Sequence, residues 1–236
     1  MNDLAVTFEI AGSTDRRFVK WAPAGSPLDL DRERARLGWA IRFTPVPEVL
    51  DHGRDTEGSW FVTRALPGAN AIDERWKADP APAVAAIGAG LRAFHDALPV
   101  AACPFTWSVE ERLADIRRRS ALGTIRPERW YIDHQHLELD DVFAILAEPP
   151  AIDQLVVCHG DTCAPNTIVG DDGRCTGHVD LGALGVADRW ADLAIATWST
   201  KWNYGPGWED AVLEAYGIAP DPERTRYYRL IWDLGP

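Results

Sequence analysis

Residues 156–182 read VVCHGDTCAPNTIVGDDGRCTGHVDLG, and this stretch decides the fold of the chain. Three short β-type runs lie in or next to this stretch, at Gln154–Cys158, Thr167–Val169 and Cys175–Val179. Asp161 and Asn166 follow the first run, and Asp180 follows the third. If the first run leads into a loop and the other two form a returning hairpin, these three side chains meet. One acid in such a place is ordinary, because Asp is a common turn residue, but three converging polar side chains indicate a site.

The three side chains suit one kind of chemistry. Two carboxylates and an amide oxygen are hard oxygen ligands of the kind that Mg²⁺ prefers. An Asp beside them could also orient an attacking hydroxyl and accept its proton. Positioning and charge neutralisation supply most of the catalysis in phosphoryl transfer, so the pattern predicts that reaction. A zinc site is poorly supported, because Cys158 and Cys163 lack zinc-finger spacing, and no GxSxG-like elbow supports a hydrolase.

The composition narrows the class of protein. The chain has 236 residues, of which 46% are hydrophobic and eleven are Trp, enough for a core with aromatic surface. A formal net charge of −12 argues against a nucleic-acid partner and suits a cationic one, although an acidic surface also serves solubility. No apolar run approaches the ~18 residues of a membrane helix. Cysteines without a CxxC pair, and no signal peptide, favour reduced thiols and a cytoplasmic location.

The first third of the chain has β-type patterning. The run LAVTFEI at residues 4–10, the turn residues Gly12–Arg16 and the run RFVKW at residues 17–21 predict a hairpin. A helix is predicted over Leu30–Ile41, introduced by Asp29. PVPEVLDHG at residues 45–53 and GSWFVTRAL at residues 58–66 predict two further strands, joined by a turn over Asp51–Gly58.

The rest of the chain is mainly helical in pattern. A helix is predicted from an apolar stripe at spacings of three and four, formed by Val84, Ile87, Leu91, Phe94 and Leu98. Further helices are predicted after Ser108, over Asp140–Glu148, near Asp188–Thr200, over Trp208–Tyr216 and over Pro222–Asp233. The predicted organisation is an α+β bilobal fold, with a small β-rich lobe at residues 1–67 and a larger helical lobe at residues 68–236.

The motifs of this chain resemble one family. The segments HGD at residues 159–161, Asn166 and DLG at residues 180–182 match the HGDxxxxN…DxG pattern of aminoglycoside phosphotransferases, relatives of the protein kinases. FVKWAP at residues 18–23 resembles the family strand with the ATP-phosphate lysine, and DRERARLGW at residues 31–39 resembles the helix with its glutamate partner. CPF at residues 103–105 is similar to the 3′-phosphotransferase branch. The resemblance covers nearly the whole chain and implies a protein-kinase-like fold with a nucleotide-binding N-terminal lobe.

The resemblance implies a role for each matching residue. Asp161 is the catalytic aspartate, and Asn166 and Asp180 hold Mg²⁺. Lys20 contacts the α- and β-phosphates of ATP, and Glu33 pairs with Lys20 to orient it. The implied cofactors are therefore ATP and Mg²⁺.

Other matching residues are expected to have supporting roles. The linker at Arg64 to Leu66 supplies backbone hydrogen bonds to adenine. His159 is expected to brace the catalytic loop. Asp188 and Asp192 match the family's DxxxD element and are expected to hold that loop, although a solvated helix face is the alternative for both.

The chain also departs from the family pattern. Met1-Asn2-Asp3 leads straight into the family's second strand, so the first strand and part of the loop over the ATP phosphates are expected to be absent. Ala183 stands where many 3′-phosphotransferases have Arg, and Trp198-Ser199 replaces an Arg-Asp pair that touches the aminoglycoside. The last departure weakens the inference about the substrate most.

The resemblance implies ATP-dependent phosphoryl transfer to a hydroxyl of an aminoglycoside, of the 3′-type, which gives antibiotic resistance. Asp133 and Asp233 match acids that face this polycationic, small-molecule substrate. Glu209 and Asp210 could add charge, although acids at a helix start are ordinary. The alternatives are a kinase of another hydroxylated small molecule and a degenerate, nucleotide-binding pseudokinase.

Overall fold

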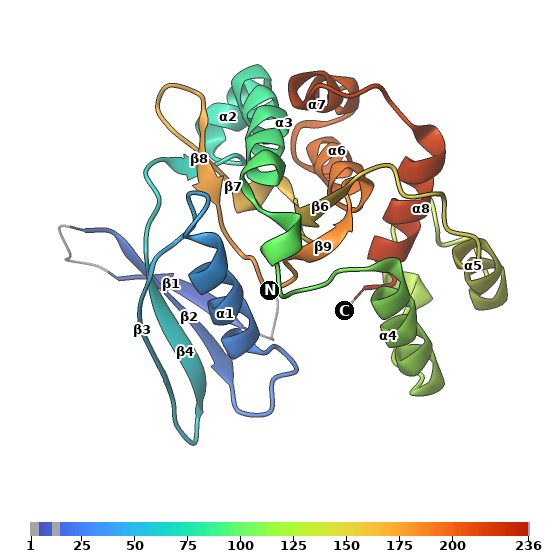
Figure 1. The fold of residues 1–236 in the computed structure, drawn as a ribbon, viewed down its shortest axis with the longest axis horizontal. Coiled ribbons are helices and arrows are strands. Elements are labelled where there is room, and N and C mark those ends of the chain that lie inside the picture. The colour runs from blue at the N-terminus through green and yellow to red at the C-terminus, as the bar shows by residue number, and fades with distance from the viewer. Residues whose placement is uncertain (1–4, 11–14, 236) are drawn as a thin grey trace.

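The computed structural model describes residues 5–10 and 15–235, which form a small sheet region and a larger helical region (Figure 1). The sheet region comes first in the chain, and helices with short sheets form the rest. This is the α+β organisation that the sequence predicted. Within the described residues, no helix is both long and apolar enough to cross a membrane.

The N-terminal sheet places Lys20 in an inner strand. Its antiparallel strands are, in spatial order, β1 (Val6–Glu9), β2 (Arg17–Pro23), β4 (Gly58–Arg64) and β3 (Val49–Arg54). β2 pairs with β4 along its whole length, which sets Lys20 opposite Phe61. Helix α1 (Leu30–Ala40) packs against β3 and β4, and the Asp29 carboxylate caps its first turn by accepting backbone N–H groups. The helix therefore stands over the sheet with its first turn fixed.

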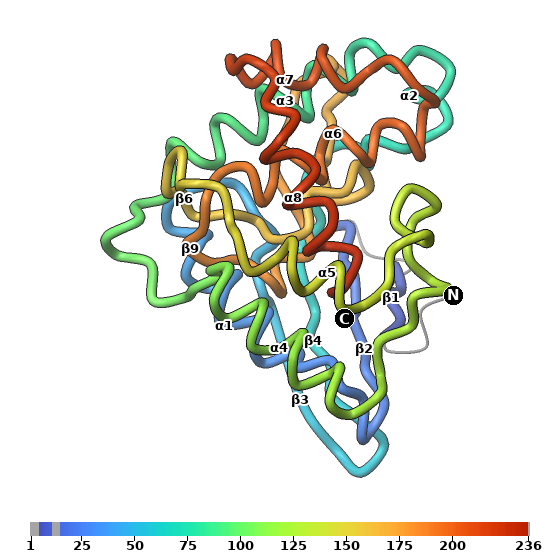
Figure 2. The backbone as a smooth tube through the Cα atoms, turned by 90° about the vertical axis from the view of Figure 1, so that its right-hand side faces the viewer, coloured from blue at the N-terminus to red at the C-terminus, as the bar shows by residue number. Residues whose placement is uncertain are grey.

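The helical region contains the remaining elements. They are β5 (Ala69–Asn70), α2 (Glu74–Ala78), α3 (Pro80–Ala97), α4 (Val109–Ala121), α5 (Leu139–Leu146), β6 (Leu155–Cys158), β7 (Thr167–Val169), β8 (Cys175–His178), β9 (Gly185–Asp188), α6 (Trp190–Tyr204), α7 (Glu209–Tyr216) and α8 (Pro222–Asp233). Short 3-10 helices cover Val100–Ala102, Pro127–Arg129 and Ala164–Asn166. β6 pairs with β9, and β7 lies between β5 and β8. The backbone tube shows α6 and α8 side by side through this region (Figure 2).

The core joins the two regions. The larger cluster of buried apolar side chains belongs to the helical region and includes Ile87, Trp198 and Ile231. A smaller cluster includes Phe61 from the sheet and Leu184 from the segment after β8. This cluster contains residues from both sides of residue 67. The division into residues 1–67 and 68–236 stays a prediction.

Most predicted elements are present, and some boundaries differ. The helix over Pro222–Asp233 and the strand over Thr167–Val169 are confirmed. The turn predicted over Asp51–Gly58 is wrong in extent, because β3 continues to Arg54 and pairs there with Ser59. Residues 1–4 and 11–14 lie outside the described residues. The predicted strand from residue 4 and the predicted turn at Gly12–Arg16 fall partly on them. The expected absence of a preceding strand also concerns the undescribed residues at the start of the chain.

The segment at residues 185–188 is a strand that the sequence did not predict. The predicted helix near Asp188 begins instead at Trp190, because Asp188 ends β9. The buried Asp188 carboxylate accepts the N–H groups of Asp153 at 2.7 Å and Trp190 at 2.9 Å. Asp188 therefore holds backbone together, and the alternative of a solvated helix face is wrong for it.

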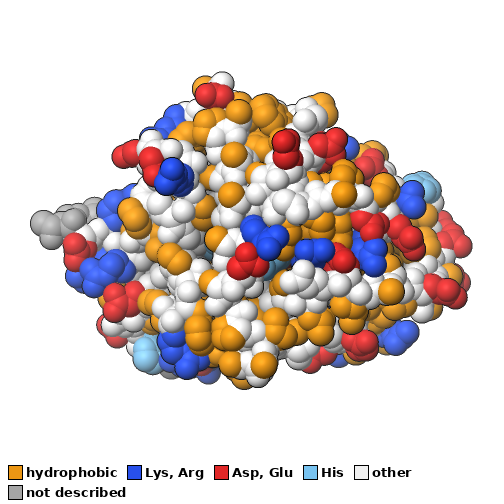
Figure 3. All heavy atoms as spheres, turned by 45° about the horizontal axis from the view of Figure 1, so that its top comes forward, with side chains coloured by type: hydrophobic (Ala, Val, Ile, Leu, Met, Phe, Trp, Pro, Cys, Tyr) orange, Lys and Arg blue, Asp and Glu red, His pale blue; other side chains and the backbone are white. Residues whose placement is uncertain are grey.

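The surface carries charges of both signs. On the face shown in Figure 3, acidic and basic side chains are interspersed among apolar patches. Exposed charges of opposite sign form ion pairs, such as Arg16–Glu9 at 2.9 Å and Arg92–Asp96 at 2.7 Å. Such exposed pairs are screened by water and contribute little to stability, so the fold depends mainly on the buried clusters.

Candidate active site

Lys20 links the N-terminal sheet to the helical region through two carboxylates. Its ammonium Nζ donates to Glu33 Oε2 at 2.7 Å and to Asp180 Oδ1 at 2.7 Å. Glu33 lies in the first turns of α1, and Asp180 follows β8. The side chain of Glu33 is 6% exposed, that of Lys20 is 15% exposed and that of Asp180 is 47% exposed. The network therefore has a buried end at Glu33 and an open end at Asp180.

Burial controls the charges of this network. Burial raises the pKa of Glu33 to about 7, although the Lys20 ammonium opposes the shift. Burial also disfavours the charged form of Lys20, but Glu33 and Asp180 outweigh it and raise the pKa of Lys20. A desolvated ion pair keeps its charges only while its partners stay in contact. Lys20 is therefore a protonated donor that Glu33 holds in place.

The loop after β6 is braced by its own histidine. The Asp161 N–H donates to His159 Nδ1 at 3.2 Å, and His159 Nε2 lies 2.9 Å from Val179 O. Since Nδ1 accepts a hydrogen bond, Nε2 carries the proton and donates to Val179 O. The predicted bracing role of His159 is confirmed by these contacts, which tie the loop to the residue before Asp180.

Asp192 on α6 anchors the same loop. Its Oδ2 accepts the His159 N–H at 2.6 Å, its Oδ1 accepts the Gly160 N–H at 2.9 Å, and His95 Nε2 lies 3.0 Å from Oδ2. Burial tends to raise the pKa of Asp192, but the hydrogen bond and charge of His95 and further bonds keep that pKa below its ordinary value. The side chain is fully buried, so the alternative of a solvated helix face is wrong for Asp192 as well.

Gly160 allows this loop to approach the segment after Asp180. Its φ of 87° lies in the left-handed region, which side chains disfavour. A Cβ at this position would lie 2.5 Å from Ala183 O. The glycine of the HGD motif is therefore required by both the backbone angle and the close approach.

Asp161 carries an unsatisfied oxygen. Its Oδ1 is buried and has no hydrogen-bond partner among the described residues. The surrounding backbone is fixed, because Asn166 Nδ2 donates to Asp161 O at 2.9 Å and the Ala164 N–H donates to Ser199 Oγ at 2.8 Å. A buried, unpaired acceptor is rare and costs about 1–3 kcal/mol, so it marks a place where a donor from outside would bind.

Asn166 and Asp180 supply oxygens that fit a magnesium ion. The amide nitrogen of Asn166 binds Asp161 O, which leaves its Oδ1 as an acceptor, and Asp180 has Oδ2 in addition to the Oδ1 on Lys20. The Val179 N–H donates to Asn166 O at 3.0 Å, which keeps the two segments adjacent. Asp180 has a φ of 63°, in the left-handed region that few non-glycine residues adopt. Amide and carboxylate oxygens are the donors that Mg²⁺ prefers.

The linker after β4 exposes backbone groups. The Arg64 side chain lies on the surface, where it pairs with Glu48 at 3.1 Å and Asp15 at 2.9 Å. Within the part of the chain that the structure describes, the N–H and C=O of Leu66 have no hydrogen-bond partner. The linker thus offers a donor and an acceptor of the kind that an adenine edge needs. The adenine contact itself stays a prediction.

The two acids assigned to the substrate lie in different surroundings. Asp133 is 56% exposed, and its Oδ2 lies 3.8 Å from Lys201 Nζ. Asp233 is 6% exposed, and its Oδ2 accepts the Tyr131 N–H at 2.8 Å and lies 2.7 Å from His134 Nδ1. Asp233 therefore braces the loop that carries Asp133. Contact of either acid with a substrate stays a prediction.

An aromatic cluster beside the catalytic loop was not predicted. Ring centroids lie 4.7 Å apart for Tyr131 and Trp198, 5.0 Å for Trp198 and Trp202, and 5.5 Å for Trp202 and Trp232. Trp198 directly precedes Ser199, the residue that holds the catalytic loop. The spacing of four residues between Trp198 and Trp202 was a signal in the sequence. Their contact with Tyr131 and Trp232 depends on the tertiary structure.

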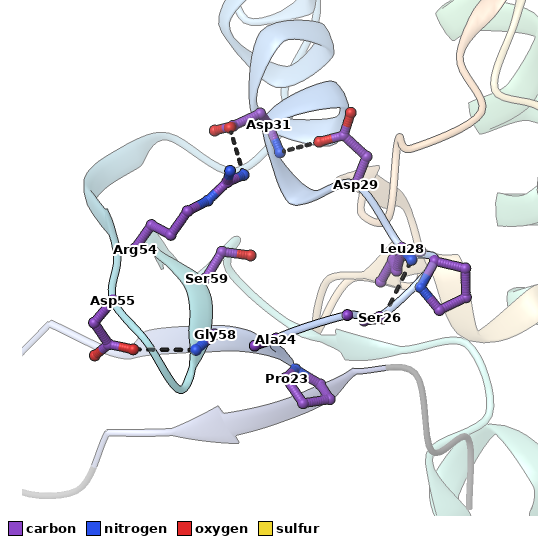
Figure 4. A pocket seen from close by; sticks show the side chains of 12 residues that line it. Pro23, Ala24, Ser26, Leu28, Asp29, Asp31, Arg54, Asp55, Gly58 and Ser59 are labelled. Carbon is purple, nitrogen blue, oxygen red and sulfur yellow. Dashed lines mark hydrogen bonds and ion pairs between the residues drawn. The ribbon is translucent and has the colours of Figure 1, made fainter.

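A separate pocket lies in the N-terminal region (Figure 4). It has a volume of about 450 Å³ and is lined by the end of β2, the loop before α1 and the β3–β4 turn. Within it, Arg54 Nη2 lies 3.1 Å from Asp31 Oδ2. Lys20, Glu33 and Asp161 do not line this pocket, so it is distinct from the network described above.

The fold and this site define a kinase-like phosphotransferase, and comparison with known proteins agrees. The model of the APH phosphotransferase enzyme family matches residues 4–228. An aminoglycoside 3′-phosphotransferase of Streptomyces fradiae is 38% identical over 225 residues, which cover 89% of this chain and 81% of that protein. The chain therefore belongs to the APH phosphotransferase enzyme family.

Solved structures agree with this assignment. A crystal structure of an aminoglycoside-3′-phosphotransferase of type VIII has a TM-score of 0.82 and 31% identity, covering 98% of this chain and 89% of that chain. The aminoglycoside phosphotransferase APH(3″)-Id of Streptomyces rimosus, in complex with ADP and streptomycin, has a TM-score of 0.76 and 30% identity. That match covers 92% of this chain and 86% of the other. The kinase-like fold predicted from the motifs is thus confirmed.

Proposed function

We propose that this protein transfers the terminal phosphoryl group of ATP to the 3′-hydroxyl of an aminoglycoside, and thereby confers antibiotic resistance. The observation that carries the proposal is the Lys20–Glu33–Asp180 network next to the unsatisfied Oδ1 of Asp161. Relatives support the two substrates, since one is an aminoglycoside 3′-phosphotransferase and another binds ADP and streptomycin.

On the nucleotide side, Lys20 donates to the α- and β-phosphates while Glu33 keeps its ammonium in position. Asn166 and Asp180 would hold Mg²⁺, which neutralises the charge that develops on the phosphate oxygens. The Leu66 N–H and C=O, in the linker that begins at Arg64, bind the adenine edge. These groups orient the nucleotide without forming a covalent bond to it.

On the acceptor side, Asp161 binds the incoming hydroxyl. Its unpaired Oδ1 accepts the hydroxyl hydrogen bond, which directs the oxygen toward the phosphoryl group and provides a base for its proton. Asp133 attracts an ammonium group of the aminoglycoside, and Asp233 keeps the loop of Asp133 in place. The partly exposed rings of Tyr131 and Trp202 offer flat apolar faces for a sugar ring.

A 3″-type reaction is the second candidate. It is favoured by the likeness to the APH(3″)-Id complex with streptomycin. Trp198-Ser199 stands where better-known members of the family are expected to have an Arg-Asp pair that touches the aminoglycoside, so the acceptor is open to test. The two candidates differ only in the acceptor, so they share every group on the nucleotide side.

An acceptor panel tests the proposal. Purified protein with ATP and Mg²⁺ is incubated separately with a 2-deoxystreptamine aminoglycoside, with its 3′-deoxy analogue and with streptomycin. The mass of each acceptor is then measured by mass spectrometry. We expect a gain of one phosphate on the first compound alone. Phosphorylation of the 3′-deoxy analogue excludes the 3′-position, and phosphorylation of streptomycin alone supports the second candidate. No phosphorylation of any of them overturns the aminoglycoside assignment.

A further inference from the structure

Arg36 is a buried cation one turn beyond Glu33 on α1. The two residues are three positions apart, so their side chains lie on the same face of the helix. Arg36 is 6% exposed, which is unusual for an arginine. Neither the nucleotide nor the acceptor chemistry proposed above requires it.

The guanidinium of Arg36 reaches two distant segments. Its Nε donates to Leu184 O at 2.7 Å, across 148 positions of sequence. Its Cζ lies 4.7 Å from the ring centroid of Phe105, and its Nη1 donates to Arg32 O at 3.3 Å. In the described chain, no carboxylate lies within ion-pair distance of it. Arg36 is thus held by a carbonyl and a ring, without a counter-charge in contact.

Burying the guanidinium of Arg36 in this way lowers the stability of the fold. Burial, together with nearby Arg32, lowers the pKa of Arg36 to about 10. Removing a cation from water without a paired anion is unfavourable, and an apolar side chain of similar volume would be favoured on stability alone. Because stability alone does not account for Arg36, the segments that it contacts indicate its role.

Leu184 belongs to the segment that carries Asp180. It closes a turn in which the Leu184 N–H donates to Leu181 O at 3.0 Å, and both leucines are fully buried. Two residues further on, the Val186 N–H donates to Phe105 O at 3.0 Å. The guanidinium thus contacts α1, the segment after Asp180 and the strand-like segment at Phe105 at one point.

We propose that Arg36 is a positioning residue that fixes α1 against the segment after Asp180, so that Glu33 and Asp180 contact Lys20 at the same time. The inference rests on the proposed phosphoryl transfer only for its effect on turnover. Its effect on binding of the nucleotide phosphates rests on the proposed contact of Lys20 with them, and not on the identity of the acceptor. Arg36 touches no reacting atom, and it acts through Lys20.

The experiment compares three variants of the full chain. Arg36→Met keeps an unbranched apolar stem and removes the guanidinium, and Arg36→Lys keeps the charge without the planar group. Arg42→Met is the matched control, because Arg42 Nε also donates to a carbonyl, Trp39 O at 3.1 Å, and its Cζ also lies over a ring, Phe43 at 5.2 Å. Those contacts of Arg42 stay within its own turn of chain, so they connect no distant segments.

The first measurement is nucleotide binding by calorimetry with Mg²⁺, using adenosine and ADP as probes. We expect Arg36→Met to weaken ADP by about 10-fold and adenosine by less than about 2-fold, since only phosphates contact Lys20. Arg36→Lys should lie between wild type and Arg36→Met, and Arg42→Met should match wild type. Equal weakening of both probes, or none, overturns the proposal. If Arg36→Met does not fold, the same comparison is made with Arg36→Lys.

The second measurement is turnover of the acceptor that the panel identifies. A displacement of about 1 Å in a catalytic group costs about 100-fold, so kcat of Arg36→Met should fall by up to that factor, with the KM of the acceptor unchanged. Combined with Glu33→Gln, the losses should be less than multiplicative, because both act through Lys20. Multiplicative losses overturn the proposal. If wild type binds ADP but phosphorylates no aminoglycoside, the function fails while the binding test of Arg36 still stands.

Discussion

The nucleotide side and the acceptor side of this site are built differently. On the nucleotide side, Lys20 contacts Asp180 across 160 positions of sequence, and each charge has a partner that the motif identifies. On the acceptor side, Asp233 is bound to the protein's own backbone, and Asp133 faces a lysine. The motif residues thus predict which charged groups form ion pairs with each other. They do not predict which acids remain free to bind a ligand.

The largest effect is expected at Asp161, where the two sides meet. Asp161→Asn keeps the size and shape of the side chain but removes the base, so turnover should fall by about 10²–10⁴-fold or more. The thermal unfolding midpoint and the Kd of ADP should stay near those of wild type. Turnover within a few-fold of wild type would remove Asp161 from its assigned role.

The next effect concerns Asp192, which anchors the loop at His159 and Gly160. Asp192→Ala leaves the His159 N–H, the Gly160 N–H and His95 without their acceptor, and each buried, unpaired donor costs about 1–3 kcal/mol. We expect the free energy of unfolding in urea to fall by at least about 3 kcal/mol. A loss below about 1 kcal/mol would mean that water or another group replaces the carboxylate, and that the loop is not anchored from α6.

A smaller effect depends on pH. Burial, and then the neighbouring His159, lower the pKa of His178 to about 3, below its ordinary value of 6.5. The unfolded chain therefore takes up a proton below pH 6.5 that the folded chain refuses until about pH 3, so stability is lost as pH falls through this window.

The test compares urea unfolding of wild type and His178→Gln between pH 6 and pH 4. Stability of the wild type should fall by about 1.4 kcal/mol per pH unit more than that of the variant, the value for one proton. If stability fell equally with pH in both proteins, His178 would be protonated inside the fold and its surroundings would be open to water.

The smallest effect is expected on the acceptor side. Lys201→Met removes the cation 3.8 Å from Asp133 and frees that carboxylate for an ammonium group of the substrate. Partly exposed pairs of this kind are worth about 1 kcal/mol, so the KM of a polycationic acceptor should fall by about 2- to 5-fold with the KM of ATP unchanged. A rise in the acceptor KM would show that Lys201 binds the substrate, and the comparison of the two sides would need revision.

Local signals in the sequence were sufficient for several elements. The helix over Pro222–Asp233 has both Pro at its first position and Asp221 as its cap, whose carboxylate accepts the Arg224 N–H at 3.0 Å. Ser108 caps α4 in the same way, accepting the Glu111 N–H at 3.3 Å. These contacts involve residues three apart, so the sequence itself contains both partners.

Other features could not be predicted because their partners are distant. The strand at residues 185–188 exists because β6 pairs with it, and four residues ending in Asp carry little strand signal alone. Asp233 matched a substrate-facing acid, yet its neighbours Tyr131 and His134 come from a loop about 100 positions earlier. The aromatic cluster and the contacts of Arg36 depend on distant segments in the same way.

The sequence by itself determined the family, the kinase-like α+β fold and the set of groups for nucleotide chemistry, because these follow from motif residues in a fixed order. The tertiary structure alone decided which of those groups touch, which acid is buried, and which arginine joins α1 to the segment after Asp180. The physical reason is that hydrogen bonds and desolvation act over a few ångströms in space. Only folding brings together residues such as Lys20 and Asp180, which are 160 positions apart.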